Sequence, residues 1–204
     1  MSPAGRSYHH GDLRGQLLGR AAEIIARDGV EAFSLRAVAA ELGVSHTAPR
    51  HHFGDRQGVL TALATQGWTL LGEALETAAP LGFPDVGAAY VLFAVSHPGH
   101  FAVMHAPDLV HAHDPALVAA STRATRLLLD GVAAVAPGTR EEVAVKAAAV
   151  WALVHGLATL ALSGALAHDH LLGSGLRDLH HLVLRATSLL DLDRDGLVDD
   201  PYRL

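Results

Sequence analysis

The chain has 204 residues, of which half are apolar, 18% are charged and none is cysteine. The lack of cysteine excludes disulfides and thiolate-bound metals. The net charge of −6 argues against binding to nucleic acid through overall charge. The charge is uneven, however. Residues 1–56 hold seven arginines and six acidic residues, a sum of +1, whereas residues 57–204 hold eight basic and fifteen acidic residues, a sum of −7. A neutral-to-basic N-terminal part, residues 1–56, is compatible with local contact to DNA even though residues 57–204 are acidic.

The composition predicts an all-α protein, because alanine and leucine dominate and runs of β-branched residues are scarce. No apolar run follows a basic start, so we expect no secretory signal. The most apolar segment, Ala147–Leu166, is long enough to span a membrane, but His155, Gly156 and Gly164 interrupt it. We interpret it instead as a helix buried at a subunit interface. A cytoplasmic protein without a membrane partner is therefore expected.

About nine helices are predicted from apolar periodicity and from glycine and proline breaks. Residues 1–7 are expected to form an arm ahead of them. We expect residues 1–55 to form a three-helix head and residues 56–204 a helical domain for ligand binding and dimerisation. The expected helices are Gly11–Asp28, Leu35–Leu42, His46–His52, Asp55–Ala78, Asp85–Ser96, His100–His105, Ala116–Ala136, Arg140–Leu166 and Leu176–Leu190.

The segment Ser34–Leu60 has the pattern of a helix-turn-helix. Ser34 suits a helix N-cap, because its side-chain oxygen can accept a hydrogen bond from the first turn. Gly43 suits the left-handed position after a helix end, and Ser45 is a second candidate cap. The second helix is too short to be stable alone, so its neighbours must hold it while its polar side chains face outward. This layout offers the second helix to the DNA major groove.

Polar side chains that could contact DNA cluster on and beside these two short helices. Thr47 and Arg50 are three residues apart and share a helix face, where arginine can bind guanine and the threonine methyl can contact thymine. Pro49 removes one hydrogen bond, at small cost near the first turn. The alternative is an ordinary solvated helix surface. The predicted DNA-contacting residues are Arg36, Ser45, His46, Thr47, Arg50, His51, His52 and Arg56.

An ordered set of motifs resembles the N-terminal domain of TetR-type transcriptional repressors. These are YHHGDLR at Tyr8–Arg14, then FSLRAVAAELGVS, then APRHHFGDR at Ala48–Arg56. The family usually has tyrosine in place of Arg50 and lysine in place of Arg56. The resemblance implies phosphate contacts from His52 and Arg56. It also implies two heads on a pseudo-palindromic operator, with repression relieved by a small ligand.

The segment from Trp151 to Gly156 resembles the W-x-x-x-H-G signature of one C-terminal class of these regulators. The resemblance implies that the last two long helices pair with those of a second subunit in a four-helix bundle. Aromatic, methionine and histidine side chains in this half are candidates for a mostly apolar ligand pocket, although a lone buried histidine is more often a core residue. The candidates are Phe93, His97, Phe101, Met104, His105, Trp151 and His155.

The acidic segment Asp191–Asp200 begins like an EF-hand calcium loop, D-x-D-x-D-G. The oxygens of Asp191, Asp193 and Asp195, the carbonyl of Leu197 and a water on Asp199 would be the ligands. The twelfth position carries Tyr202 instead of the bidentate glutamate, and no exiting helix follows. A weak calcium site and a solvated acidic tail therefore remain alternatives, and no cofactor is required.

Zinc ligation by the histidine pairs His111/His113, His168/His170 and His180/His181 is a further alternative, although no fixed helical spacing brings them together. No nucleophile elbow, phosphate-binding loop or dinucleotide motif occurs, so an enzyme is not expected. We predict a homodimeric regulator that binds a double-stranded operator and a small-molecule effector. The alternatives are a metal- or calcium-responsive regulator and a helical ligand-binding protein without DNA function.

Overall fold

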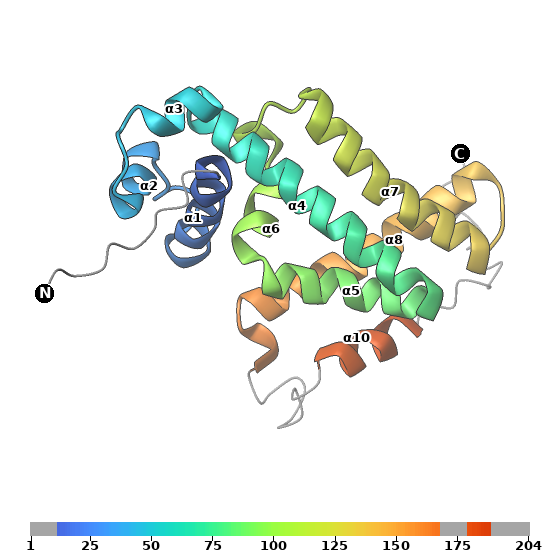
Figure 1. Ribbon diagram of the computed structural model, residues 1–204. Helices are drawn as coiled ribbons and strands as arrows, with labels where there is room; N and C mark the ends of the chain where they lie inside the picture. Colours follow the sequence, from blue (N-terminus) through green and yellow to red (C-terminus); the bar gives the residue numbers. More distant parts are fainter. Residues whose placement is uncertain (1–11, 168–178, 189–204) are drawn as a thin grey trace, which may run out of the picture. The chain divides into compact units, whose positions relative to one another are not determined.

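The computed structural model describes residues 12–167 and 179–188. Within these residues it confirms the all-α prediction, with nine α-helices, three 3-10 turns and no strand. The α-helices are α1 (Leu13–Asp28), α2 (Leu35–Leu42), α3 (Ala48–Phe53), α4 (Arg56–Ala78), α5 (Phe83–Ser96), α6 (Pro98–Met104), α7 (Pro115–Val135), α8 (Arg140–Leu162) and α10 (Leu179–Ser188), and the 3-10 turns are η1 (Ala79–Leu81), η2 (Pro107–Leu109) and η3 (Ala165–Ala167) (Figure 1).

Several predicted helix ends are confirmed by their hydrogen bonds. The Ser34 hydroxyl accepts from the backbone N–H of Ala37 at 3.2 Å and starts α2. Gly43 ends α2 in the left-handed conformation, with φ of 66°. The predicted helix start at Arg140 is confirmed as well, and Thr139 and Glu142 form a reciprocal capping box there. These ends are set by local side-chain chemistry, which is why sequence alone predicts them.

Other bounds differ from the prediction. The predicted helix His46–His52 begins only at Ala48, because the Ser45 hydroxyl accepts from the Thr47 N–H at 3.2 Å and forms a turn there instead of capping a helix. Pro49 consequently lies in the first turn, where its missing N–H has no intrahelical partner to lose. The helix expected to reach Leu166 stops at Leu162, and Gly164 follows with a φ of 73°.

Packing divides the chain into two compact units, neither of which is continuous in sequence. The first unit comprises residues 1–70 and 97–121, and the second comprises residues 71–96 and 122–204. The predicted boundary between residues 55 and 56 thus falls inside the first unit, which also takes α6, η2 and the start of α7. The sequence suggested a continuous head because its motifs are continuous, whereas the packing that completes the head comes from later residues.

The first unit is built on one apolar cluster. Buried side chains of α1, α2 and α4 form most of this cluster, and Val103, Val110 and Leu117 add to it from the later segment. Helix α6 packs directly on α1. The exposed sides of α2 and α3 are therefore carried on a continuous apolar core, which holds the two short helices in place.

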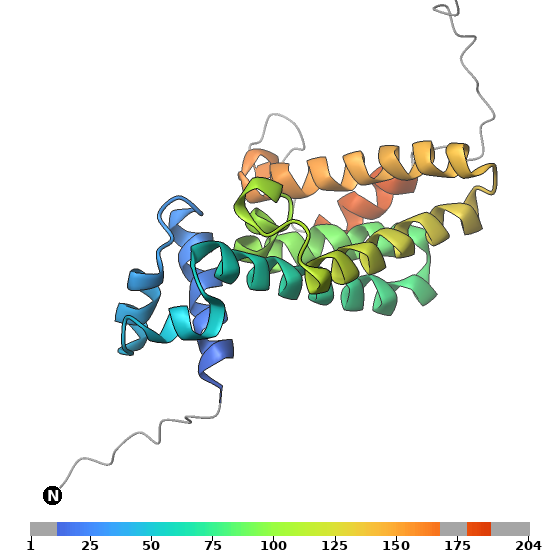
Figure 2. The same cartoon turned by 90° about the horizontal axis from the view of Figure 1, so that it is seen from above.

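In the second unit, α5 lies against α8 and α10 (Figure 2). Val132, Ala147 and Val150 form a buried cluster with partly buried side chains around it. Helix α8 is long and apolar enough to cross a membrane, with a mean hydropathy of 1.7 over its most apolar stretch, yet only 22% of that stretch is buried in the single chain. One face of α8 packs within the unit, while another is apolar and exposed.

Candidate nucleic-acid interface

The turn between α2 and α3 is held by backbone hydrogen bonds and by small polar side chains. The N–H of Val44 donates to the carbonyl of Ala39 at 3.0 Å, which closes the end of α2. The hydroxyls of Ser45 and Thr47 are 2.8 Å apart and share a hydrogen bond. On the inner side, Pro49 is fully buried and seats the first turn of α3. The outer side of the turn and of α3 is left to polar residues.

Seven of the eight predicted DNA-contacting side chains are exposed, on α2, on α3 and in the turn between them. The side chains at the α3 end are close to one another, with the rings of His51 and His52 centred 5.5 Å apart. Within the described head, this places hydroxyl, imidazole and guanidinium donors on one short helix and its turn, which is the chemistry that reads base edges and phosphates. The exposed members of the predicted set are Arg36, Ser45, His46, Thr47, Arg50, His51 and His52.

Arg56 differs from the others because it is partly buried and bound to the backbone of its own unit. Its Nη2 donates to the carbonyl of Val30 at 2.7 Å, and its Nε donates to the carbonyl of Phe33 at 3.2 Å. The guanidinium also lies 5.8 Å from the centre of the Phe33 ring. Arg56 therefore anchors the segment between α1 and α2. A phosphate contact from Arg56 stays a prediction and would rely on its remaining N–H groups.

Replacing Arg56 with alanine is expected to lower the free energy of unfolding by about 1.5–3 kcal/mol, because a charged donor leaves two backbone carbonyls. Arg56→Lys should recover only part of this loss, since an ammonium lacks the planar fork that reaches both acceptors. Chemical denaturation followed by circular dichroism measures the difference. Arg36→Ala, on the exposed side of α2, is the control and should stay within about 0.5 kcal/mol of the wild type.

A second arginine was not singled out from the sequence. The Arg14 guanidinium on α1 lies over the ring of Phe53, the last residue of α3, at 5.1 Å from the ring centre. Such a contact joins residues far apart in the chain. The only sequence feature that points to Arg14 is the family-like YHHGDLR motif, of which Arg14 is the last residue.

The predicted ligand-pocket residues fall into the two units. In the first unit, the His105 ring lies between two aromatic rings, with centroids 5.2 Å from Trp68 and 4.9 Å from Phe101. Met104 packs against the backbone of Gly67, and His97 stands 5.7 Å from the ring of His100. Their role in ligand binding stays a prediction.

In the second unit, the Trp151 and His155 side chains meet at Tyr90, which is not among the predicted pocket residues. The Tyr90 hydroxyl accepts from Trp151 Nε1 at 3.3 Å and lies 2.9 Å from His155 Nδ1. Burial raises the pKa of Tyr90 to about 12, so the phenol stays protonated. Phe93 on the same helix is also buried. These contacts span more than sixty residues, and periodicity within a single helix cannot indicate them.

The metal predictions have no counterpart in the described part of the chain. Asp191, Asp193, Asp195, Leu197 and Asp199 lie outside the described residues, as do His168 and His170. Among residues 12–167 and 179–188, no three histidine, aspartate or glutamate side chains come together as metal ligands. Calcium binding by the acidic segment stays a prediction from its sequence.

Comparison with known proteins gives consistent family matches. Residues 17–63 match the family of bacterial regulatory proteins of the tetR type, and residues 83–182 match a tetracyclin repressor-like C-terminal domain. No curated protein matches the chain.

Among solved structures, a protein of unknown function from Rhodococcus sp. RHA1 is 34% identical, with 91% of this chain and 96% of that chain covered and a TM-score of 0.71. The TetR family transcriptional regulator PfmR from Thermus thermophilus is 18% identical, with 85% and 96% covered and a TM-score of 0.63. A bacterial regulatory protein in the tetR family from Rhodococcus RHA1 is 18% identical, with 86% and 93% covered and a TM-score of 0.60. The two family matches together span most of the chain, which therefore belongs to the TetR family and is a DNA-binding transcriptional regulator.

Proposed function

We propose that the protein is a homodimeric, cytoplasmic repressor without enzymatic activity, which a small and mostly apolar ligand releases from a pseudo-palindromic operator. The DNA-binding part of this proposal rests on the exposed polar side chains of the turn and of α3. The buried Pro49 supports them from the inner side of the helix. A rigid support behind a set of exposed donors is what a recognition helix needs, because the donors must hold their positions relative to base edges.

Arg50 is the side chain on which sequence preference would depend most. It is exposed in the middle of α3, three residues after Thr47, and it stands where the family usually has tyrosine. A guanidinium can bind guanine O6 and N7 through two hydrogen bonds, which a tyrosine cannot do. We infer docking like that of the family with a different base preference.

The dimer part of the proposal is supported by the second unit taken alone. Helix α8 leaves Val145 65% exposed, Trp151 44% exposed and Leu160 43% exposed. The exposed side of α8 also carries Ala148, Ala149 and Ala152, which lie between these side chains. An exposed apolar surface of this kind is rarely left in water by a monomer. A second copy of the same helix would cover it, and two heads could then meet two half-sites of a symmetric operator.

Ligand release would follow from unequal binding to two states. A ligand lowers operator affinity only if it binds more tightly to the arrangement of the heads that does not fit DNA. Phe93, Trp151 and His155 in the second unit offer apolar area with a few polar groups, as small-molecule sites usually do. The sign of the response, repression relieved by ligand, is part of the proposal.

Genomic fragments selected by the protein provide the operator on which the proposal is tested. In a mobility-shift titration, Arg50→Ala should weaken binding to the selected operator by about tenfold or more, which corresponds to one lost bidentate contact. Arg126→Ala on the exposed part of α7 removes the same charge outside the head and is the matched control.

The affinity of the wild-type protein for the operator should fall as the salt concentration rises. Unchanged affinity in Arg50→Ala would remove Arg50 from the interface, and binding that salt does not affect would contradict the DNA function.

A further inference from the structure

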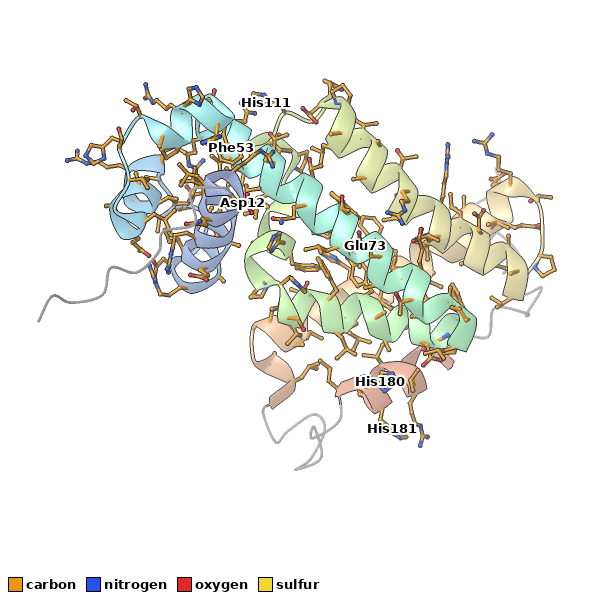
Figure 3. The ribbon with its side chains drawn as sticks, in the orientation of Figure 1. Asp12, Phe53, Glu73, His111, His180 and His181 are labelled. Carbon is orange, nitrogen blue, oxygen red and sulfur yellow. The ribbon has the colours of Figure 1, made fainter. Side chains whose placement is uncertain are left out.

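The first unit contains a cavity of about 490 Å³ beside the end of α3, within the size range of small-molecule sites. It is formed by α1, the end of α3, one side of α4 and the segment that leads into α7. Figure 3 shows Phe53 and His111, two of its lining residues, near the start of α4. None of the ligand-pocket residues predicted from the sequence lines it.

The wall of this cavity is fixed by hydrogen bonds within the unit. The buried Thr61 hydroxyl donates to the carbonyl of Gln57 at 2.8 Å and accepts from the N–H of His111 at 2.9 Å. The side-chain amide of Gln57 donates to the carbonyl of Val110 at 2.9 Å. These bonds tie the segment before α7 to α4. The cavity is thus a built feature with a set shape.

Around the cavity, the polar groups that form no hydrogen bond within the described residues are mostly hydrogen-bond donors. Within the described residues, the Arg14 guanidinium stacks on Phe53 and forms no ion pair, so its N–H edges stay available. The Gln66 oxygen accepts from His100 Nε2 at 3.1 Å, and the Gln66 amide nitrogen forms no hydrogen bond within those residues. The imidazole of His52 adds a further donor.

The one carboxylate among the lining residues, Asp114, has one of its oxygens engaged by backbone N–H groups. Its Oδ1 accepts from the N–H groups of Ala116 and Leu117, both at 3.0 Å, at the start of the long helix α7. A helix N-terminus stabilises such a negative charge. The positive charge at the cavity is that of Arg14, which forms no ion pair within the described residues and lies beside the apolar surfaces of Phe53 and Leu18.

We propose that this cavity binds a small organic carboxylate, with the anionic group on Arg14 and the apolar body against Phe53 and Leu18. Donors that outnumber acceptors select an anion, and the mixed lining selects an anion that has an apolar part. Because His52 and Phe53 end α3, a bound carboxylate would also compete with DNA for this end of the helix, a consequence that rests on the proposed function.

Binding is tested on the full chain without DNA, so that failure of DNA recognition does not affect the result. Benzoate, hexanoate and acetate are titrated by calorimetry and by amide shifts of Gly58 and Thr65 in NMR spectra. Benzamide has nearly the shape of benzoate without the charge, and inorganic phosphate tests whether a phosphate group alone is preferred. We expect benzoate or hexanoate to bind at least tenfold more tightly than benzamide, acetate and phosphate.

Two variants locate the site. Arg14→Met keeps an apolar stem and removes the charge, and Ala116→Phe fills the cavity from an exposed position with little risk to folding. Both should weaken benzoate binding at least tenfold. The matched controls are Arg126→Met and Ala119→Phe, which lie outside the cavity and should stay within twofold of the wild type. No binding by any carboxylate, equal binding of benzamide, or wild-type affinity in Ala116→Phe would overturn the proposal. Binding of phosphate alone would overturn it in favour of a DNA phosphate as the occupant.

Discussion

A Gly99→Ala variant is expected to lose about 3 kcal/mol or more of its free energy of unfolding, because Gly99 lies where α6 packs on α1. A Cβ atom at this position would come within 2.8 Å of the carbonyl carbon of Ala22 and nearer still to its carbonyl oxygen. Both are backbone atoms of α1, so no side-chain rotation relieves the clash. Overpacking of this kind costs about 1–3 kcal/mol where side chains can move, and more where they cannot.

Gly19→Ala is the matched control for this prediction. Gly19 is an exposed residue inside α1, and a Cβ there meets nothing within 4 Å. Alanine should therefore raise the free energy of unfolding by about 0.5–1 kcal/mol, because it limits the unfolded chain and favours the helix. Urea denaturation of both variants gives the comparison. A Gly99→Ala protein as stable as the wild type would show that α1 and α6 are not in close contact.

The largest expected pH effect comes from His100, a buried histidine in the first unit. Burial, together with the nearby His97, lowers the pKa of His100 to about 4. The folded protein therefore holds this imidazole neutral at pH 7, with its Nε2–H donating to Gln66. In the unfolded chain the same group takes up a proton near its usual pKa of about 6.5.

The direction of the effect follows from this difference. Between pH 6.5 and about 4, the unfolded chain binds a proton that the folded protein does not bind. The free energy of unfolding should therefore fall as the pH is lowered through this range, by on the order of 2–3 kcal/mol from His100 alone. Stability at pH 7 to 8 is unaffected by this group.

His100→Gln separates this contribution from the other acid-sensitive groups. Glutamine keeps an N–H donor for Gln66 and cannot be protonated, so the variant should lose less stability than the wild type between pH 6.5 and 4. His51→Gln on the exposed face of α3 serves as the control and should follow the wild-type curve. Denaturation at several pH values provides the measurement. Parallel curves for the wild type and His100→Gln would contradict the prediction.

Features set by neighbouring residues could be predicted from the sequence. The caps at Ser34 and Thr139 and the left-handed Gly43 each depend on side chains within four residues, so their patterns are visible in the chain. The exposed polar row of α3 was predicted for the same reason, because the motif that carries it is continuous. Its start at Ala48 was missed, since the Ser45 hydroxyl bonds to the turn instead of starting the helix.

Features set by distant residues could not be predicted from the sequence. The family resemblance implies a phosphate contact for Arg56, but nothing in the sequence indicates its hydrogen bonds to carbonyls 23 and 26 residues earlier. Tyr90 is absent from the predicted pocket because its partners Trp151 and His155 belong to another helix. A single sequence without paired changes among relatives contains no signal for such contacts, so only the folded packing shows them.

The interrupted first unit has a consequence for how the protein is made. The motifs of the DNA-binding head end by Arg56, but its apolar core also needs Val103, Val110 and Leu117. During synthesis the head therefore cannot close its core until well over half of the chain has left the ribosome, and the segment 71–96 of the other unit emerges in between. For the same reason, a chimaeric regulator joined after residue 55 would carry a head with an open core. A graft that preserves this head must bring residues 97–121 with it.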